Sequence, residues 1–227
     1  MDGILVIDKP QGMTSHDVVD LVRKKFRVKK AGHAGTLDPM ATGVLVLLIG
    51  KCTKLSGRFI SDDKDYEGSL VLGATSDTLD AWGKITPGGR TADIEEEDVK
   101  KAFAGFMGEI EQLPPMYSAV KLQGKKLYEL ARKGIEVKRE PRKVHIKRFD
   151  ITRIELPKVN FSVTCSKGTY VRQLCADIGA SLGSGAYLSE LKRMRSGVFT
   201  IDKAVKMDEL LGSGMGDLEK RLVNCAG

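Results

Sequence analysis

The sequence predicts a mixed α/β domain of the α+β class. Two observations carry this prediction: short apolar runs typical of buried strands recur along the chain, and helical segments with recognisable start or stop signals lie between them. With 227 residues and 41% hydrophobic content, the chain is long enough for one substantial core and too short for several full domains. It contains no internal repeat and no low-complexity segment. One principal unit is therefore expected.

Apolar clustering and alternation predict strands at 4–7, 44–49, 69–72 and 159–165, and a strand or hairpin arm at 143–156. Helices are predicted from Thr14 to Phe26, from Asp93 to Phe106, at 127–133 before Gly134, and at 170–182. Thr14 with Asp17, and Asp93 with Glu96, resemble capping boxes that open the first two helices. A glycine-rich stretch at 32–43 then lies between the first helix and a core strand.

The charge balance favours a polyanionic partner. The chain has 37 basic and 30 acidic residues, a net charge of +7, and a pI near 9.2. Eleven Lys and Arg residues fall between 121 and 148, at 121, 125, 126, 132, 133, 138, 139, 142, 143, 147 and 148. A solvated face and an RNA-binding surface both fit this segment.

A second basic run closes the first predicted helix, with cations at 23, 24, 25, 27, 29 and 30. Such cations suit the negative end of a helix and could equally contact phosphate.

Composition also bears on the compartment. The longest apolar run, 44–49, is far below the roughly 20 residues that span a bilayer, and no basic flank precedes the N-terminal apolar residues. We therefore expect no membrane anchor and no secretion signal. Cys52, Cys165, Cys175 and Cys225 are widely spaced and form no Cys-x-x-Cys pair, which favours reduced thiols in the cytoplasm.

A nucleotide hydrolase is excluded by spacing. Gly50 and Lys51 follow an apolar strand, as in a phosphate-binding loop, but Leu45 and Cys52 occupy the positions where that loop needs Gly and Ser or Thr.

The glycine-rich stretch at 32–43 places His33 and Asp38 in a loop of small residues before a core strand. Such a loop lets a polynucleotide backbone approach closely. From local chemistry alone, Asp38 before Pro39 is most simply an Asx-turn residue, and catalysis is the alternative.

Several motifs together resemble the TruB family of tRNA pseudouridine synthases. They cover roughly residues 3 to 200 in the family's order: GILVIDKP at 3–10, GHAGTLDPMATG at 32–43, KDYEG at 64–68, PPMYSAVK at 114–121, LYELARKG at 127–134 and CSKGTYVR at 165–172. Several spaced motifs in one order are more specific than any single pattern. The resemblance implies a pseudouridine synthase fold, with a largely antiparallel central sheet, flanking helices and an RNA-binding cleft.

The resemblance also implies the chemistry. A uridine would be isomerised to pseudouridine without metal or cofactor, with Asp38 as the covalent nucleophile. Arg172 matches the arginine that pairs with that carboxylate, and Tyr66 matches the tyrosine that stacks on the target base and takes the C5 proton. Asp38, Tyr66 and Arg172 are therefore the expected catalytic residues.

Further positions match the family's substrate-binding residues. Tyr170 and Leu191 would line the uracil pocket, and His33 would fill the space left when the base flips out of its stack. Lys9 would hold phosphate together with the basic segment. The implied substrate is the T-loop uridine conventionally numbered 55 in tRNA.

The implied organisation is a catalytic domain at 1–202 and a short tail at 203–227, without the full C-terminal PUA domain of many bacterial members. We expect a cytoplasmic monomer that binds the tRNA T-arm and needs no protein partner. Two alternatives remain: a guide-RNA-dependent subunit like the dyskerin-type relatives, and a tRNA-binding or tRNA-folding protein in which catalysis is secondary.

Overall fold

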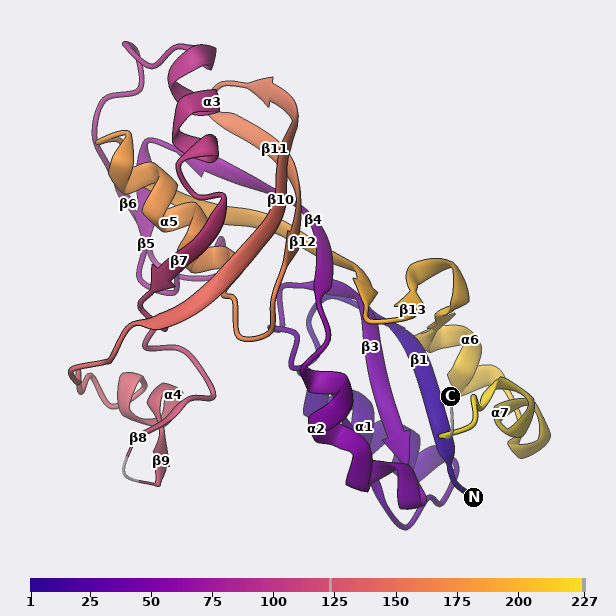
Figure 1. The fold of residues 1–227 in the computed structure, drawn as a ribbon. Helices are drawn as coiled ribbons and strands as arrows, with labels where there is room; N and C mark the ends of the chain where they lie inside the picture. Colours follow the sequence, from indigo (N-terminus) through magenta and orange to yellow (C-terminus); the bar gives the residue numbers. More distant parts are fainter. Residues whose placement is uncertain (123, 226–227) are drawn as a thin grey trace. The chain divides into compact units, whose positions relative to one another are not determined.

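The computed structural model describes residues 1–122 and 124–225. The chain forms two compact units (Figure 1): unit 1 comprises Met1–Glu67 and Leu191–Gly227, and unit 2 comprises Gly68–Glu190. Strands β4 (Lys64–Leu72) and β12 (Ala186–Ser196) each run from one unit into the other. Both units combine strands with helices, which confirms the predicted mixed α/β class.

Unit 1 is built on the antiparallel pair β1 (Gly3–Lys9) and β3 (Thr42–Ile49), with partners from Gly3 and Ile49 to Lys9 and Gly43. Both strands were predicted from their apolar runs. Neighbouring strands are β2 (Ala31–His33) against β3, β12 parallel to β3, β13 (Phe199–Thr200) against β12 and β14 (Val205–Lys206) parallel to β1. The helices are α1 (Ser15–Lys25), η1 (Gly50–Leu55), α2 (Ser56–Ile60), η2 (Ile201–Lys203), α6 (Met207–Gly212) and α7 (Met215–Arg221).

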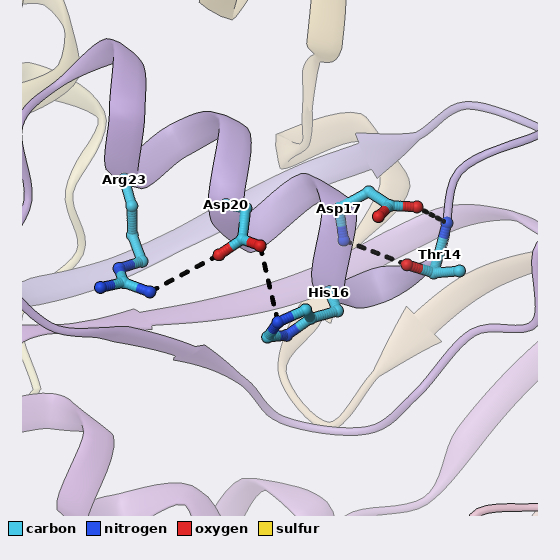
Figure 2. A network of polar contacts seen from close by, with 5 residues as sticks. All are labelled: Thr14, His16, Asp17, Asp20 and Arg23. Atoms are coloured by element: carbon cyan, nitrogen blue, oxygen red, sulfur yellow. Dashed lines mark hydrogen bonds and ion pairs between the residues drawn. The ribbon is translucent and has the colours of Figure 1, made fainter. Parts of the chain in front are cut away.

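Helix α1 begins with the predicted capping box (Figure 2). The Asp17 amide donates to the Thr14 hydroxyl at 3.1 Å, and the Thr14 amide donates to the Asp17 carboxylate at 2.8 Å. This exchange satisfies two amide donors at the start of the helix. Val18, Val19 and Val22 are buried, so the helix packs one face against the sheet and leaves its charged face to solvent.

The core of unit 1 contains aliphatic residues from alternate positions of β1 and β3, including Ile4, Val6, Val44, Val46 and Leu48. Residues near the C-terminus join it, because the Val223 amide donates to the Ile4 carbonyl at 2.9 Å.

The cysteines correct one expectation. Cys52 and Cys225 form a disulfide, whereas Cys165 and Cys175 are buried and form no disulfide. The prediction of four reduced thiols is wrong for this pair, because residues 173 apart in sequence meet where the C-terminal segment packs against η1.

Unit 2 contains β4, β11 (Lys158–Cys165), β10 (Arg142–Glu155) and β7 (Gly108–Gln112) in that order, with antiparallel pairing of β11 to β10 and β10 to β7. Two small hairpins are β5 (Ala74–Ser76) with β6 (Ile85–Pro87), and β8 (Lys121–Leu122) with β9 (Lys125–Lys126). The helices are α3 (Glu96–Ala104), α4 (Leu127–Ala131) and α5 (Val171–Ser181).

Helix α3 packs beside β10 in unit 2 (Figure 1), where an aromatic cluster holds it on the sheet. The Phe103 ring lies 4.4 Å from that of Phe149, and Phe149 meets Phe161 edge to face at 5.4 Å between ring centres. The helix itself starts later than predicted. Its cap is Glu95, whose amide donates to the Asp98 carboxylate, because the predicted cap Asp93 lies in a turn closed by Ile94 and Thr91.

Candidate active site

Asp38 lies in the loop between β2 and β3, half-buried in unit 1. Its carbonyl accepts from the Ala41 amide at 3.0 Å, so the chain turns tightly before β3 begins. The next residue is also held, since the Pro39 carbonyl accepts from the Gly12 amide at 2.9 Å. These backbone bonds tie the Asp38 loop to the loop that follows β1.

Lys9, at the end of β1, is fully buried. Its ammonium group donates to the carbonyls of Pro10 at 2.8 Å, Met13 at 2.7 Å and Pro39 at 3.5 Å. Burial lowers the pKa of Lys9 to about 8, and the neighbouring Asp38 carboxylate opposes that shift. Lys9 thereby ties together the two loops beside Asp38, and its expected phosphate contact stays a prediction.

Arg193, on β12, contacts the loop that carries Asp38, and the sequence analysis did not single it out. It is 1% exposed, and its guanidinium donates to the carbonyls of Val44 at 2.6 Å, Thr36 at 3.4 Å and Gly35 at 3.1 Å. It therefore holds the backbone of the Asp38 loop and of the start of β3. The sequence carried no signal for this role, since an arginine in a strand is usually exposed.

A third buried group holds the same loop. The Ser15 hydroxyl, at the first position of α1, donates to the Leu37 carbonyl at 3.0 Å and accepts from the Leu37 amide at 2.8 Å. Both backbone groups of the residue before Asp38 are thus fixed to a helix.

His33 ends β2, opposite Leu47 on β3. Its Nδ1 atom is buried without a hydrogen-bond partner among the described residues. Burial, followed by the positive charge of Arg193, lowers the pKa of His33 below its ordinary value. The imidazole is therefore neutral at physiological pH, and a neutral ring suits contact with a base better than contact with phosphate.

Tyr66 and Leu191 lie on the strands that border the Asp38 loop in unit 1. Tyr66 is buried on β4, on the same face as Lys64, whose side chain comes close to Gly35. Leu191 is half-buried and directly precedes the residues of β12 that pair with Thr42 and Gly43 of β3. Lys9, His33, Asp38, Tyr66 and Leu191 thus all belong to unit 1, and the gathering of Tyr66 and Leu191 around Asp38 stays a prediction.

Tyr170 and Arg172 lie in unit 2, at the start of α5. The Tyr170 amide donates to the Gln112 side chain at 2.7 Å, and Gln112 donates back to the Tyr170 carbonyl at 3.1 Å. Arg172 is 4% exposed and donates to the carbonyls of Tyr117 at 2.6 Å and Thr78 at 3.3 Å. Its guanidinium also lies over the Tyr170 ring, 5.7 Å from the ring centre. The pairing of Arg172 with Asp38 stays a prediction.

The basic segment at 121–148 lies in unit 2. Its cations are exposed at 125, 132, 133, 138, 142, 143, 147 and 148, and the side chain of Lys121 lies outside the described part of the structure. Some are neutralised locally, as in the Lys143–Glu109 pair at 2.8 Å. Lys125, Lys133 and Lys138 have no acidic partner within the described residues, so positive charge remains on this surface.

The described residues also limit other classes of site. Within 1–122 and 124–225, no group of three or more His, Cys, Asp or Glu side chains could hold a metal ion. None of the helices described here is long and apolar enough to cross a bilayer.

Comparisons with known proteins show which family the chain resembles. Residues 23–171 match the N-terminal domain of the TruB family of pseudouridylate synthases, and residues 172–222 match the C-terminal domain of tRNA pseudouridylate synthase B. The chain is 46% identical over 223 residues to the tRNA pseudouridine synthase B of Opitutus terrae, covering 98% of this chain and 92% of that protein. It is 50% identical over 206 residues to that of Chlamydia pneumoniae, covering 90% and 86%.

Among solved structures, the chain resembles that of a Cbf5-Nop10-Gar1 complex, with a TM-score of 0.73 and 32% identity. That match covers 92% of this chain and 54% of the other.

Proposed function

The chain belongs to the TruB family of pseudouridylate synthases and is a tRNA-modifying isomerase, and on this premise we propose that it converts the T-loop uridine numbered 55 to pseudouridine. The reaction breaks the N1–C1′ bond, turns the uracil and joins C5 to C1′, while the C5 proton leaves and N1 gains a proton. Nothing is oxidised overall, so the proposal includes no cofactor and no metal.

Asp38 is the proposed nucleophile. A carboxylate can carry the intermediate covalently between the two bond changes, and an ordinary aspartate is ionised at neutral pH because its pKa is about 3.9. The observation that carries the proposal is the support of this one loop by three buried side chains, Lys9, Ser15 and Arg193. Such support fixes a reacting group in place and avoids the cost of ordering it during the reaction.

The remaining roles follow from the chemistry of each group. Tyr66 would stack on the uracil and take the C5 proton, and Tyr170 with Leu191 would hold the detached base between apolar surfaces. The neutral His33 would fill the place of the flipped nucleotide. Arg172 would pair with Asp38 and keep it charged.

The same proposal includes the RNA partner, the oligomeric state and the cellular compartment. The enzyme would act as a cytoplasmic monomer on the tRNA T-arm, without a protein partner. The exposed cations of the 121–148 segment would hold the RNA backbone by charge and shape.

The test uses the purified chain alone with an unmodified tRNA transcript that carries tritium at uracil C5. Isomerisation replaces that hydrogen, so tritium release measures turnover directly. A transcript with cytidine in place of the T-loop uridine, labelled in its other uridines, is the matched control. We expect release from the first transcript and none from the second. Equal release from both would refute the assigned position.

A second candidate is a partner-dependent enzyme, favoured by the likeness to Cbf5 in complex with Nop10 and Gar1. The same assay separates the two. Tritium release by the chain alone supports the stand-alone enzyme, whereas tight tRNA binding without release supports the partner-dependent one.

A further inference from the structure

The C-terminal end of α1 carries a basic surface that the proposed active site does not use. We define the α1-end patch as Arg23, Lys24, Lys25, Arg27, Lys29 and Lys30, all of which are exposed. Phe26 between them is buried, which anchors this part of the chain to unit 1. Six cations therefore project from a fixed segment of eight residues.

The acidic residues of α1 neutralise little of this charge (Figure 2). Asp17 is engaged in the capping box at the other end of the helix. Asp20 pairs with His16 and with Arg23, each at 3.5 Å. Within the described residues, Lys24, Lys25, Arg27, Lys29 and Lys30 have no acidic partner. The patch therefore has a strong unbalanced positive field.

The patch also has a shape. Asp20, Arg23, Lys24, Arg27 and Val28 line a hollow of about 410 Å³ at the surface. Three cations border it with one carboxylate, Asp20, which is paired with Arg23 at 3.5 Å, so an anion in the hollow would meet a lining of net positive charge.

Arg27 is held in a conformation that its side chain disfavours. Its φ is +50°, in the left-handed region. The Val28 amide donates to the Arg23 carbonyl at 3.1 Å and the Phe26 amide to the Val22 carbonyl at 3.1 Å, so Arg27 occupies the position after the helix where glycine is usual. Strained residues of this kind cluster at functional sites.

Stabilising the end of α1 does not account for the whole patch. Favourable interaction with the helix dipole falls off beyond the last turn, which contains only Arg23, Lys24 and Lys25. Arg27, Lys29 and Lys30 lie past that turn. The backbone of Lys30 is held by the start of η1, because its carbonyl accepts from the Gly50 amide at 2.8 Å.

We propose that the α1-end patch binds the phosphate backbone of the RNA substrate at a position away from the target uridine, with Arg27 and Lys24 as central contacts. This inference rests on the proposed function, which supplies RNA as the polyanion. The patch lies at the opposite end of α1 from Ser15, which holds the Asp38 loop. It therefore contributes affinity and register, and no chemistry.

The test compares two double variants that remove equal charge. Arg27→Gly with Lys24→Gln removes two patch cations, and glycine relieves the strained backbone at position 27. Lys54→Gln with Lys206→Gln removes two exposed cations elsewhere in unit 1. Binding of the unmodified tRNA transcript is measured by filter retention between 50 and 200 mM salt, and unfolding is measured for each protein.

For the patch variant, we expect the slope of log affinity against log salt to fall by about 1.5, since each lost phosphate contact removes about 0.7 to 0.9. The ratio of wild-type to variant tRNA affinity then shrinks roughly tenfold between 50 and 200 mM salt. The control variant keeps the wild-type slope, and the patch variant melts no lower than wild type.

Two outcomes would overturn the inference. Unchanged affinity and slope in the patch variant would show that the patch is only a solvated surface, and an equal loss in both variants would show a general charge effect. Single-turnover tritium release at saturating RNA distinguishes a failure of this inference from a failure of the proposed function. It should be unchanged in the patch variant, and its absence from wild type would count against the proposed function alone.

Discussion

Buried and exposed cations do different work in unit 1. Lys9 and Arg193 are 0% and 1% exposed, and within the described part of the chain their charged groups donate hydrogen bonds to backbone carbonyls. Lys24 and Arg27 are exposed, and no carboxylate in the described residues pairs with them. The buried pair shapes the loop that carries Asp38, and the exposed pair is available to RNA.

The difference shows that burial, more than charge, decides what a basic residue contributes. A buried cation must satisfy its donors inside the protein, so removing it leaves carbonyls without partners. An exposed cation is already solvated, so removing it changes binding and leaves stability nearly intact. The following predictions test this contrast from the largest expected effect to the smallest.

Asp38→Asn should abolish catalysis and spare binding. The amide is a poor nucleophile, so we expect single-turnover tritium release to fall by about 10³-fold or more. Transfer RNA affinity should persist, because exposed cations supply it. Asp93→Asn, an exposed change in unit 2, is the control and should retain the wild-type rate. Residual turnover by Asp38→Asn near the wild-type rate would remove Asp38 from the role of nucleophile.

Arg193→Met should destabilise the protein. Three carbonyls would lose their donor, and we expect a loss of about 3 kcal/mol in the free energy of unfolding, or a fall of about 6 to 12 °C in Tm. Arg27→Gly, the exposed counterpart, should show no fall. Calorimetry of both variants makes the comparison, and equal melting temperatures for the two would contradict the role given to burial.

Lys9 should make stability depend on alkaline pH. Its pKa is about 8 in the folded protein, below the 10.5 of an ordinary lysine. Above pH 8 the unfolded chain therefore holds a proton that the folded protein has released, so the free energy of unfolding rises with pH. We expect a gain of about 2 kcal/mol between pH 8 and 9.5, and none from this residue below pH 7.

Urea unfolding across this pH range measures the effect as the difference between wild type and Lys9→Met, which should lack the rise. The exposed Lys24→Gln variant should keep it. A rise of the same size in Lys9→Met would assign the dependence to other groups.

Thr14→Ala should have the smallest effect of the four. It removes half of the capping box of α1, which is worth about 1 kcal/mol, and should lower Tm by about 2 to 4 °C. Because the change removes no charge and lies at the end of α1 opposite the α1-end patch, the salt slope of tRNA binding should stay at the wild-type value. A changed slope would mean that both ends of α1 contact RNA.

The sequence predicted those parts of the fold whose causes are local. The apolar runs of β1 and β3 and the Thr14–Asp17 capping box are visible within a few residues, and the structure confirms them. The predicted start of α3 was two residues too early, because Asp93 and Glu95 can both act as caps. The turn between Thr91 and Ile94 takes up Asp93 and leaves Glu95 as the cap.

The support of the Asp38 loop could not be predicted in this way. Arg193 donates to Val44, 149 residues earlier, and the contact exists only because β12 runs parallel to the start of β3. The burial of Lys9 likewise depends on a contact distant in sequence, since its ammonium group donates to the Pro39 carbonyl 30 residues later. The motifs identified the family and its candidate residues, but tertiary contacts decide which of them face solvent.

The length of α1 sets the distance between the Asp38 loop and the α1-end patch. Its 11 residues span about 16 Å, from Ser15 beside the Asp38 loop to the cations of the α1-end patch. An RNA that engages both ends at once must cover that length with its backbone correctly placed. An RNA fragment containing only the target loop would react without contacting the α1-end patch. The length of the helix therefore sets the minimum length of RNA that binds with full affinity.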